Sequence, residues 1–150
     1  MILLVAAVLS GASYAIRPAV SPFGGTDQSV GNGNQGNDEI SAIALEDARV
    51  HFEKGSALFA DARSMAAYRS GHIRGAMHLY PDDFDSWSGD FFSQIPPDSI
   101  IITYCEGARC TLSVELAEKL TWMGYKQVYY LKDGLGLWKK NRLPMDQVPE

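Results

Sequence analysis

The segment "SIIITYCEGARCTLSVELAEKLTWMG", residues 99–124, decides how this chain is interpreted. It opens with a continuous β-branched run, which is typical of a central parallel strand covered on both faces. Leucines then recur at helical spacing from Leu112, and Gly124 is suited to end a helix. Between strand and helix lies a short loop that begins at Cys105. The segment therefore predicts a buried strand, a tight cysteine-bearing loop and a helix.

The residues of the loop and the start of the helix are Cys105, Glu106, Gly107, Ala108, Arg109, Cys110 and Thr111. In an open α/β sheet, ligands bind beyond the carboxyl ends of the strands, where this loop is expected. Its backbone N–H groups can converge on one spot, and the helix dipole adds positive potential there. Both effects should lower the pKa of the Cys105 thiol. Small residues at 107 and 108 let the loop curl, and Arg109 offers charge to an anionic substrate.

Two interpretations of the cysteines stay open from the loop alone. Cys105 is either a thiolate nucleophile or a small buried hydrophobic residue, and it could form a disulfide with Cys110. Two cysteines in 150 residues are too few for a disulfide framework, so their role is local. A zinc site would need further ligands, and the histidines are scattered, so no metal or organic cofactor is implied.

Helical and strand patterns alternate along the rest of the chain from Ile40. Helical spacing is seen in residues 44–55, 64–71, 112–123 and 136–141. Short apolar runs typical of strands occupy residues 57–61, 75–80, 99–105 and 127–131. Residues 82–92 are interpreted as an acidic, aromatic excursion. The alternation predicts an α/β fold with a central, mostly parallel sheet.

The N-terminal residues 1–17 form an apolar segment without charge between Ile2 and Ile16. A membrane helix needs about 20 apolar residues, so this run is slightly short. It is interpreted as an uncleaved membrane anchor or a signal peptide, with a buried core helix as the alternative; the basic n-region of a signal peptide is missing. Residues 18–39 are rich in Gly, Asn, Gln and Ser and predict a flexible linker.

These features predict a folded domain over residues 40–146 that is anchored to a membrane or is periplasmic, in a bacterial cell envelope. The net charge is −5 and no cluster of Lys and Arg is present, which argues against nucleic acid as a partner.

Three segments together resemble the rhodanese-like sulfurtransferase family. They are "FADARSMAAYRSGHIRGAMHL" (59–79), "YCEGARC" (104–110) and "LKDGLGLW" (131–138), in the family's order. The resemblance covers the folded domain and none of the N-terminus. It implies a three-layer α/β/α fold with a central, mostly parallel sheet.

The resemblance also implies a persulfide mechanism at Cys105. The thiolate would attack a sulfur donor such as thiosulfate or a protein or small-molecule persulfide, hold the sulfur, and pass it to an acceptor thiol or cyanide. The residues implied as the substrate-binding loop are Glu106, Gly107, Ala108, Arg109, Cys110 and Thr111. A sulfur-carrier or binding module without turnover stays an alternative, although inactive relatives usually lack the cysteine.

The chain departs from the family pattern in two places. Asp133 replaces the first glycine of the closing motif, which puts the turn geometry in question. Cys110 stands where many relatives carry Arg, and it could act as a resolving thiol that attacks a Cys105 persulfide or sulfenate to give an internal disulfide. Glu106 would repel thiosulfate, so either its carboxylate points away or the donor is a protein persulfide.

Other interpretations carry less weight. A related class of phosphatases has Arg six positions after the cysteine, where this chain has Thr111, so phosphatase activity is disfavoured. His72 is expected to hold a turn rather than to act as a base. Asp61 and Arg63 are expected to form a structural polar pair. Core packing is the default role of the aromatic residues Trp87, Phe91 and Phe92.

Overall fold

The computed structural model describes residues 40–149. The predicted anchor or signal segment (1–17) and the predicted linker (18–39) lie outside the described residues, so both stay predictions. Within residues 40–149, no helix is both long and apolar enough to cross a membrane.

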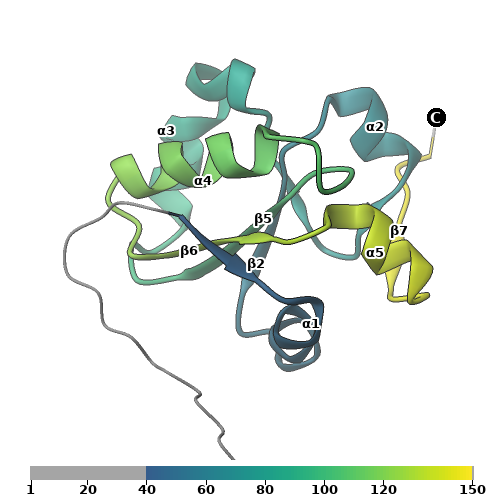
Figure 1. The fold of residues 1–150 in the computed structure, drawn as a ribbon. Helices are drawn as coiled ribbons and strands as arrows, with labels where there is room; N and C mark the ends of the chain where they lie inside the picture. The colour runs from purple at the N-terminus through teal and green to yellow at the C-terminus, as the bar shows by residue number, and fades with distance from the viewer. Residues whose placement is uncertain (1–39, 150) are drawn as a thin grey trace, which may run out of the picture. The chain divides into compact units, whose positions relative to one another are not determined.

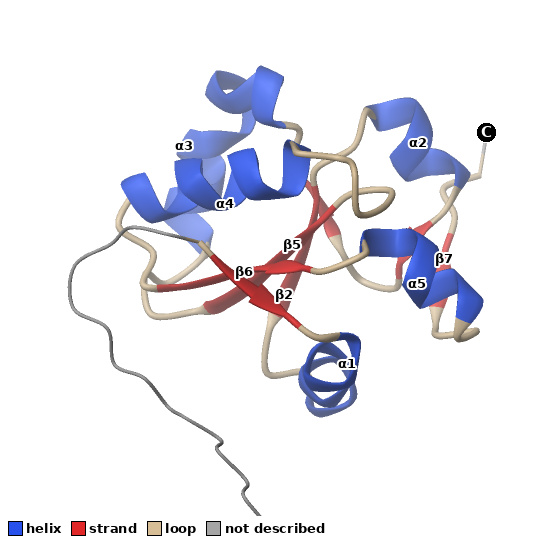
Figure 2. Ribbon diagram, in the orientation of Figure 1, coloured by secondary structure: helices blue, strands red, loops and turns tan. Residues whose placement is uncertain are grey.

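A parallel sheet forms the centre of the domain. Its strands, in spatial order, are β1 (Ser41–Ile43), β6 (Gln127–Leu131), β5 (Ile100–Tyr104), β2 (Leu58–Asp61) and β4 (Met77–His78). All four pairings between them are parallel. Figure 2 shows these strands crossing the middle of the domain in red. The predicted central, mostly parallel sheet is confirmed.

Helices cover both faces of this sheet, as the three-layer prediction requires. They are α1 (Leu45–Lys54), α2 (Met65–Ser70), α3 (Phe84–Gln94), α4 (Leu112–Trp122) and α5 (Gly134–Lys140). Helices α3 and α4 lie on one face and α1 on the other (Figure 1).

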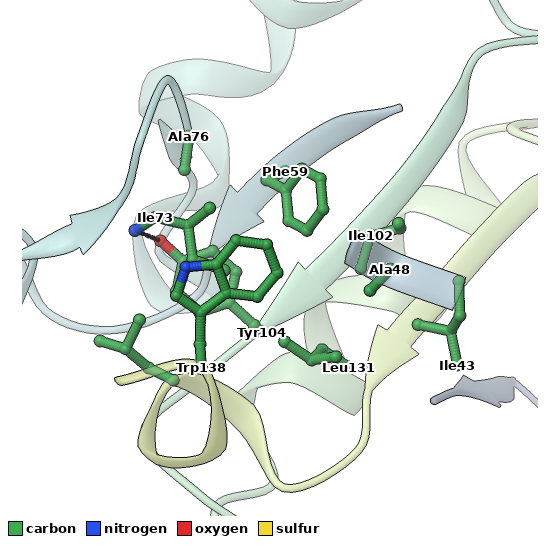
Figure 3. Packing of buried hydrophobic residues seen from close by; sticks show 10 residues of the cluster. Ile43, Ala48, Phe59, Ile73, Ala76, Ile102, Tyr104, Leu131 and Trp138 are labelled. Carbon is green, nitrogen blue, oxygen red and sulfur yellow. Dashed lines mark hydrogen bonds between the residues drawn. The ribbon is translucent and has the colours of Figure 1, made fainter. Parts of the chain in front are cut away.

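Side chains alternate across the central strands and so build two hydrophobic cores. In β5, Ile101 packs with Leu116 and Leu120 of α4, whereas Ile102 packs with residues of α1 and α5. This is the period of two that strands impose on their side chains. Figure 3 shows the second core, in which Trp138 of α5 is fully buried.

Several predicted element ends are confirmed. Gly55 ends α1 in a left-handed conformation, with φ of 60°, which glycine adopts without steric penalty. The hydroxyl of Ser64 accepts a hydrogen bond from the N–H of Ala67 at 3.4 Å and caps α2.

The interpretation of residues 82–92 as an irregular excursion is wrong. A 3-10 turn over Pro81–Asp83 leads directly into α3. Phe84, Trp87 and Phe91 follow one another at helical spacing and make edge-to-face contacts. Phe91 is buried in the core, whereas its neighbour Phe92 is about half exposed. Burial of this aromatic stripe favours a helix despite the run of aspartates.

Three short strands have no counterpart in the sequence prediction. Strand β1 extends the sheet at its edge, and β3 (His72–Ile73) pairs antiparallel with β7 (Met145–Asp146) in a separate ribbon. After β7 the chain still contacts α2, because the N–H of Val148 donates to the carbonyl of Arg69. The domain therefore makes contacts slightly beyond the predicted boundary at residue 146.

Candidate active site

The three sequence motifs meet at the carboxyl edge of the sheet. Asp61, the last residue of β2, lies opposite Tyr104, the last residue of β5. Strand β6 runs parallel on the other side of β5 and ends at Leu131, just before the closing motif. The edge is the place where α/β sheets bind ligands.

Cys105 directly follows β5 and is 1% exposed. Its thiol donates weakly to the carbonyl oxygen of Cys110, with 3.2 Å between Sγ and oxygen. The hydroxyl of Ser113, in the first turn of α4, donates to the Cys105 sulfur at 3.6 Å. The cysteine thus lies where the sequence predicts, between the strand and the helix.

The expectation that the loop lowers the pKa of Cys105 is wrong. Burial raises the pKa of this thiol, and the nearby Cys110 sulfur raises it further. Hydrogen bonds from the side chain and backbone of Ser113 lower it, but they do not outweigh burial. The loop amides do not all converge on the sulfur, since the N–H of Cys110 donates to the carbonyl of Gly107 at 2.9 Å.

The loop residues that follow Cys105 line an open hollow, and Cys105 itself does not line it. Its volume is about 490 Å³ and its lining residues are Glu106, Gly107, Ala108, Arg109 and Cys110. Arg109 is exposed. Thr111 precedes α4 without a side-chain capping bond, so it borders the loop but does not hold the helix end.

The closing motif braces this loop through its backbone. The N–H of Leu135 donates to the carbonyl of Cys105 at 2.8 Å, and the N–H of Gly136 donates to the carbonyl of Glu106 at 2.9 Å. Asp133, the departure from the family pattern, adopts a left-handed conformation with φ of 63°. Aspartate tolerates this region better than most residues, which explains how the turn survives without the glycine.

Gly134 is the glycine that the close approach requires. Its φ is +59°, and a side-chain carbon added there would collide with the carbonyl of Cys105. By contrast, a carbon added at Gly107 would meet the carbonyl oxygen of Asp133 at 4.0 Å, an ordinary contact. A small residue is therefore needed at Gly134, in the closing motif, more than at position 107 of the cysteine loop.

Arg63 joins the first motif to the cysteine loop. Its guanidinium contacts both carboxylate oxygens of Asp61, which is fully buried, and donates to the carbonyl of Gly71 at 2.7 Å. It also donates to the carboxylate of Glu106 at 2.8 Å. Burial lowers the pKa of Arg63, but the two carboxylates outweigh it, so the net shift is upward and the charge is kept. The predicted Asp61–Arg63 pair is confirmed, and it extends to the loop.

The Glu106 carboxylate lies between two cations. Besides Arg63, the ammonium of Lys139 approaches it at 3.5 Å. Burial raises the pKa of Glu106, yet the hydrogen bond from Arg63 and the charge of Lys139 lower it more, so the net shift is downward. The ionised carboxylate is compensated and does not present a free negative charge to the hollow.

The histidines near the motifs hold backbone rather than the cysteine. Nδ1 of His72 donates to the carbonyl of Tyr68 at 2.9 Å, and the two rings stack. Nε2 of His78 donates to the carbonyl of Arg63 at 2.7 Å. Among residues 40–149, no three His, Cys, Asp or Glu side chains gather as a metal site.

Sequence reasoning missed two side chains of the site. Ser113 had a usable signal, because residues in the first turn of a helix after a cysteine loop face the loop. Lys139 lay inside the closing motif, but its pairing with Glu106 depends on how α5 packs, which the sequence does not show.

The fold and site agree with the comparison to known families. The family model described as a rhodanese-like domain matches residues 44–141. The chain belongs to the rhodanese-like family. The resemblance predicted from the three motifs is thus confirmed.

Relatives of this rhodanese-like chain are bacterial. The uncharacterized protein YibN of Escherichia coli K12 is 27% identical over 107 residues, covering 71% of this chain and 73% of that protein. Thiosulfate sulfurtransferase GlpE of Tolumonas auensis is 26% identical over 101 residues, covering 67% and 90%. Among solved structures, the rhodanese-like domain of Alr3790 from Anabaena sp. is 28% identical with a TM-score of 0.58, covering 71% and 79%.

Proposed function

We propose that this rhodanese-like domain is a sulfurtransferase that carries sulfur as a persulfide on Cys105. The observation that carries the proposal is the position of this unpaired, buried thiol at the carboxyl end of β5, where it begins a loop whose following residues line an open hollow. The family resemblance and the sulfurtransferase among the relatives support the same activity.

The reaction proceeds in two balanced steps. The Cys105 thiolate attacks the outer sulfur of thiosulfate, a new S–S bond forms, and sulfite leaves with the electron pair of the old bond. An acceptor thiolate or cyanide then attacks the outer sulfur of the persulfide, and the Cys105 thiolate leaves. Covalent catalysis of this kind divides one transfer into two easier ones.

Three groups assist these steps. The hydroxyl of Ser113 donates to the sulfur and favours the thiolate against the effect of burial. Arg109 supplies positive charge at the rim of the hollow for an anionic donor. The N-terminal turn of α5 fixes the carbonyl of Cys105, so the sulfur keeps its position through both steps.

The pairing of the Glu106 carboxylate with two cations affects which sulfur donors the loop can accept. Because Arg63 and Lys139 neutralise this carboxylate, a dianionic donor such as thiosulfate does not meet an unbalanced negative charge in the loop. Thiosulfate and small-molecule persulfides are therefore both suitable donors, and a protein persulfide is not required.

The experiment is intact-protein mass spectrometry after exposure to thiosulfate or polysulfide, together with a thiosulfate:cyanide assay. We expect thiocyanate formation and sulfur loading that both disappear in Cys105→Ser. Ser93→Ala, on the exposed side of α3, serves as the control variant. Full activity in Cys105→Ser would show that Cys105 does not carry the transferred sulfur. Turnover without any adduct would point away from a persulfide, and sulfur loading without turnover would favour a carrier module.

Attachment of the domain to a membrane through residues 2–16 is a separate proposal, supported by the apolar N-terminal segment. We expect the full-length chain to sediment with membranes. Recovery of the full-length chain entirely in the soluble fraction would contradict it.

A further inference from the structure

A second thiol, that of Cys110, belongs to the same loop as the nucleophile. The Cys105 thiol contacts the backbone carbonyl of Cys110 at 3.2 Å. The presence of the Cys110 side chain raises the pKa of the Cys105 thiol, so the two thiols influence each other. Both cysteines are free, so no disulfide joins them in this state.

Cys110 is also accessible to the transferred sulfur. It is partly exposed and lines the hollow formed by the residues that follow Cys105. The turn closed by the N–H of Cys110 and the carbonyl of Gly107 reverses the chain and brings the two ends of the loop together. The loop therefore carries two thiols, and the backbone of the second contacts the sulfur of the first.

The two ends of the loop are held differently. The carbonyls of Cys105 and Glu106 accept hydrogen bonds from α5, and Glu106 is further tied to Arg63. The backbone bond of Cys110 is to Gly107 within the loop, and the helix that follows begins without a side-chain cap. Cys110 can therefore move toward Cys105 while Cys105 stays in place.

We infer that Cys110 resolves the Cys105 persulfide by forming an internal disulfide and releasing hydrosulfide. This inference rests on the proposed function, because it needs a persulfide on Cys105. The Cys110 thiolate attacks the inner sulfur, Sγ of Cys105; the Cys105–Cys110 S–S bond forms as the persulfide S–S bond breaks. The outer sulfur takes up the proton that Cys110 gives up and leaves with the electron pair as hydrosulfide. That sulfur is reduced, and the two cysteine sulfurs are oxidised.

Chemistry favours this direction of attack. Hydrosulfide is the conjugate base of a stronger acid than an alkyl thiol, and a better leaving group departs faster. Attack on the outer sulfur would only move the sulfur to Cys110 without changing the redox state. Attack on the inner sulfur makes the domain a reductase of sulfane sulfur.

A full cycle needs an external dithiol, of low molecular weight or protein, to reduce the disulfide. Thiosulfate and the dithiol are then converted to sulfite, hydrosulfide and the oxidised dithiol. With this resolving thiol the domain no longer depends on an external acceptor to remove the sulfur. The chemical class of its second substrate is a dithiol reductant.

The test is a single turnover of the full-length chain with thiosulfate in the absence of reductant. Sulfide release and intact mass are followed for wild type, Cys110→Ser and Cys105→Ser. We expect wild type to release about one equivalent of sulfide per chain and to lose two hydrogens, and peptide mapping to find the Cys105–Cys110 link. We expect Cys110→Ser to keep a gain of about 32 Da and release at least tenfold less sulfide.

Three outcomes overturn the inference. One is a wild-type chain that keeps its added sulfur without releasing sulfide, and another is sulfide release from Cys110→Ser at the wild-type rate. The third is an added sulfur that mapping places on Cys110. Failure of the proposed function looks different, because neither an added sulfur nor an internal disulfide then appears in any variant. Cys110→Ala, compared by circular dichroism, shows whether loss of sulfide release reflects the thiol or a damaged loop.

Discussion

The carbonyl of Cys105 accepts a hydrogen bond from the N–H of Leu135, 2.8 Å away, across 30 residues of sequence. The N–H groups at the start of a helix have no partner within that helix, so α5 can offer them to another segment. Here they hold the backbone of the nucleophile. The start of α5 therefore supports the cysteine loop through main-chain atoms, and these two hydrogen bonds occupy no side chain of the loop.

The first prediction concerns Gly134. Replacing it by Ala introduces a carbon that collides with the carbonyl of Cys105 at a φ of +59°. Backbone strain and overpacking each contribute about 1–3 kcal/mol, so we expect the free energy of unfolding to fall by roughly 3 kcal/mol or more. Sulfur loading of Cys105 should fall with it. Urea unfolding and mass spectrometry measure the two effects.

Gly55→Ala is the matched control for this variant. Gly55 has nearly the same φ, +60°, but a carbon added there meets nothing within 4 Å. Gly55→Ala should lose only the stability that a left-handed backbone costs an alanine, about 1–2 kcal/mol, and Cys105 should still accept sulfur. If both variants lost the same stability and both still accepted sulfur, the close approach of Gly134 to the loop would matter neither for stability nor for sulfur loading.

The second prediction concerns Arg63. Replacing it by Met leaves the carboxylate of Asp61 fully buried without its charge partner. Breaking a buried pair in this way typically destabilises by roughly 3–5 kcal/mol, so we expect a large drop in the free energy of unfolding measured with urea. It also removes one of the two cations that lie beside the Glu106 carboxylate.

Arg49→Met provides the comparison. Arg49 pairs with Glu46 and Glu53 on the surface of α1, where its side chain is 45% exposed. Exposed pairs contribute about 0–1 kcal/mol, so this variant should be nearly as stable as wild type. If Arg63→Met and Arg49→Met lost the same free energy of unfolding, the buried ion pair of Arg63 would contribute no more than an exposed pair.

The fold was largely predictable because its signals are local. The β-branched run of β5, the leucine spacing of α4 and the capping residues Gly55 and Ser64 each act within one element. Helix α3 was missed because aspartates and a glycine obscure its aromatic stripe, and its stability comes from packing. Strands β1, β3 and β7 are two or three residues long and exist only through their partners.

The site was predictable in its residues but not in its electrostatics. Cys105 and its loop lie where the sequence places them. The direction of the Cys105 pKa was wrong, because burial depends on the neighbouring elements and outweighs the donors. The pairing of Glu106 with Lys139 was likewise invisible, since the residues are 33 positions apart and meet only when α5 docks.

The third prediction concerns Ser113 and pH. Its hydroxyl donates to the Cys105 sulfur at 3.6 Å and lowers a pKa that burial has raised. Ser113→Ala removes the hydroxyl and should raise the pKa of Cys105 further, because the thiolate loses a donor. The pH midpoint of alkylation by iodoacetamide should therefore move upward, and sulfur loading at neutral pH should slow. The control Ser93→Ala should leave the midpoint unchanged. An unchanged midpoint in Ser113→Ala would show that the Ser113 hydroxyl does not lower the pKa of Cys105.

The fourth prediction compares two tryptophans. Trp138 is fully buried beside Phe59 (Figure 3). It also packs against Phe52 and donates from its indole N–H to the carbonyl of Pro144 at 3.0 Å. Trp138→Ala should lower the free energy of unfolding by about 3–5 kcal/mol, because it opens a large cavity beneath α5. Urea titration followed by circular dichroism measures this without relying on tryptophan fluorescence.

Trp122, at the end of α4, is 86% exposed, so Trp122→Ala should change stability by less than about 0.5 kcal/mol. Because Trp138 lies in the helix that holds Cys105, its loss should also slow sulfur loading under conditions where the domain is still folded. A large stability loss in Trp122→Ala would mean that its side chain is covered in solution. If folded Trp138→Ala accepted sulfur at the wild-type rate, packing of Trp138 in the core beneath α5 would not be needed to hold the cysteine loop in place.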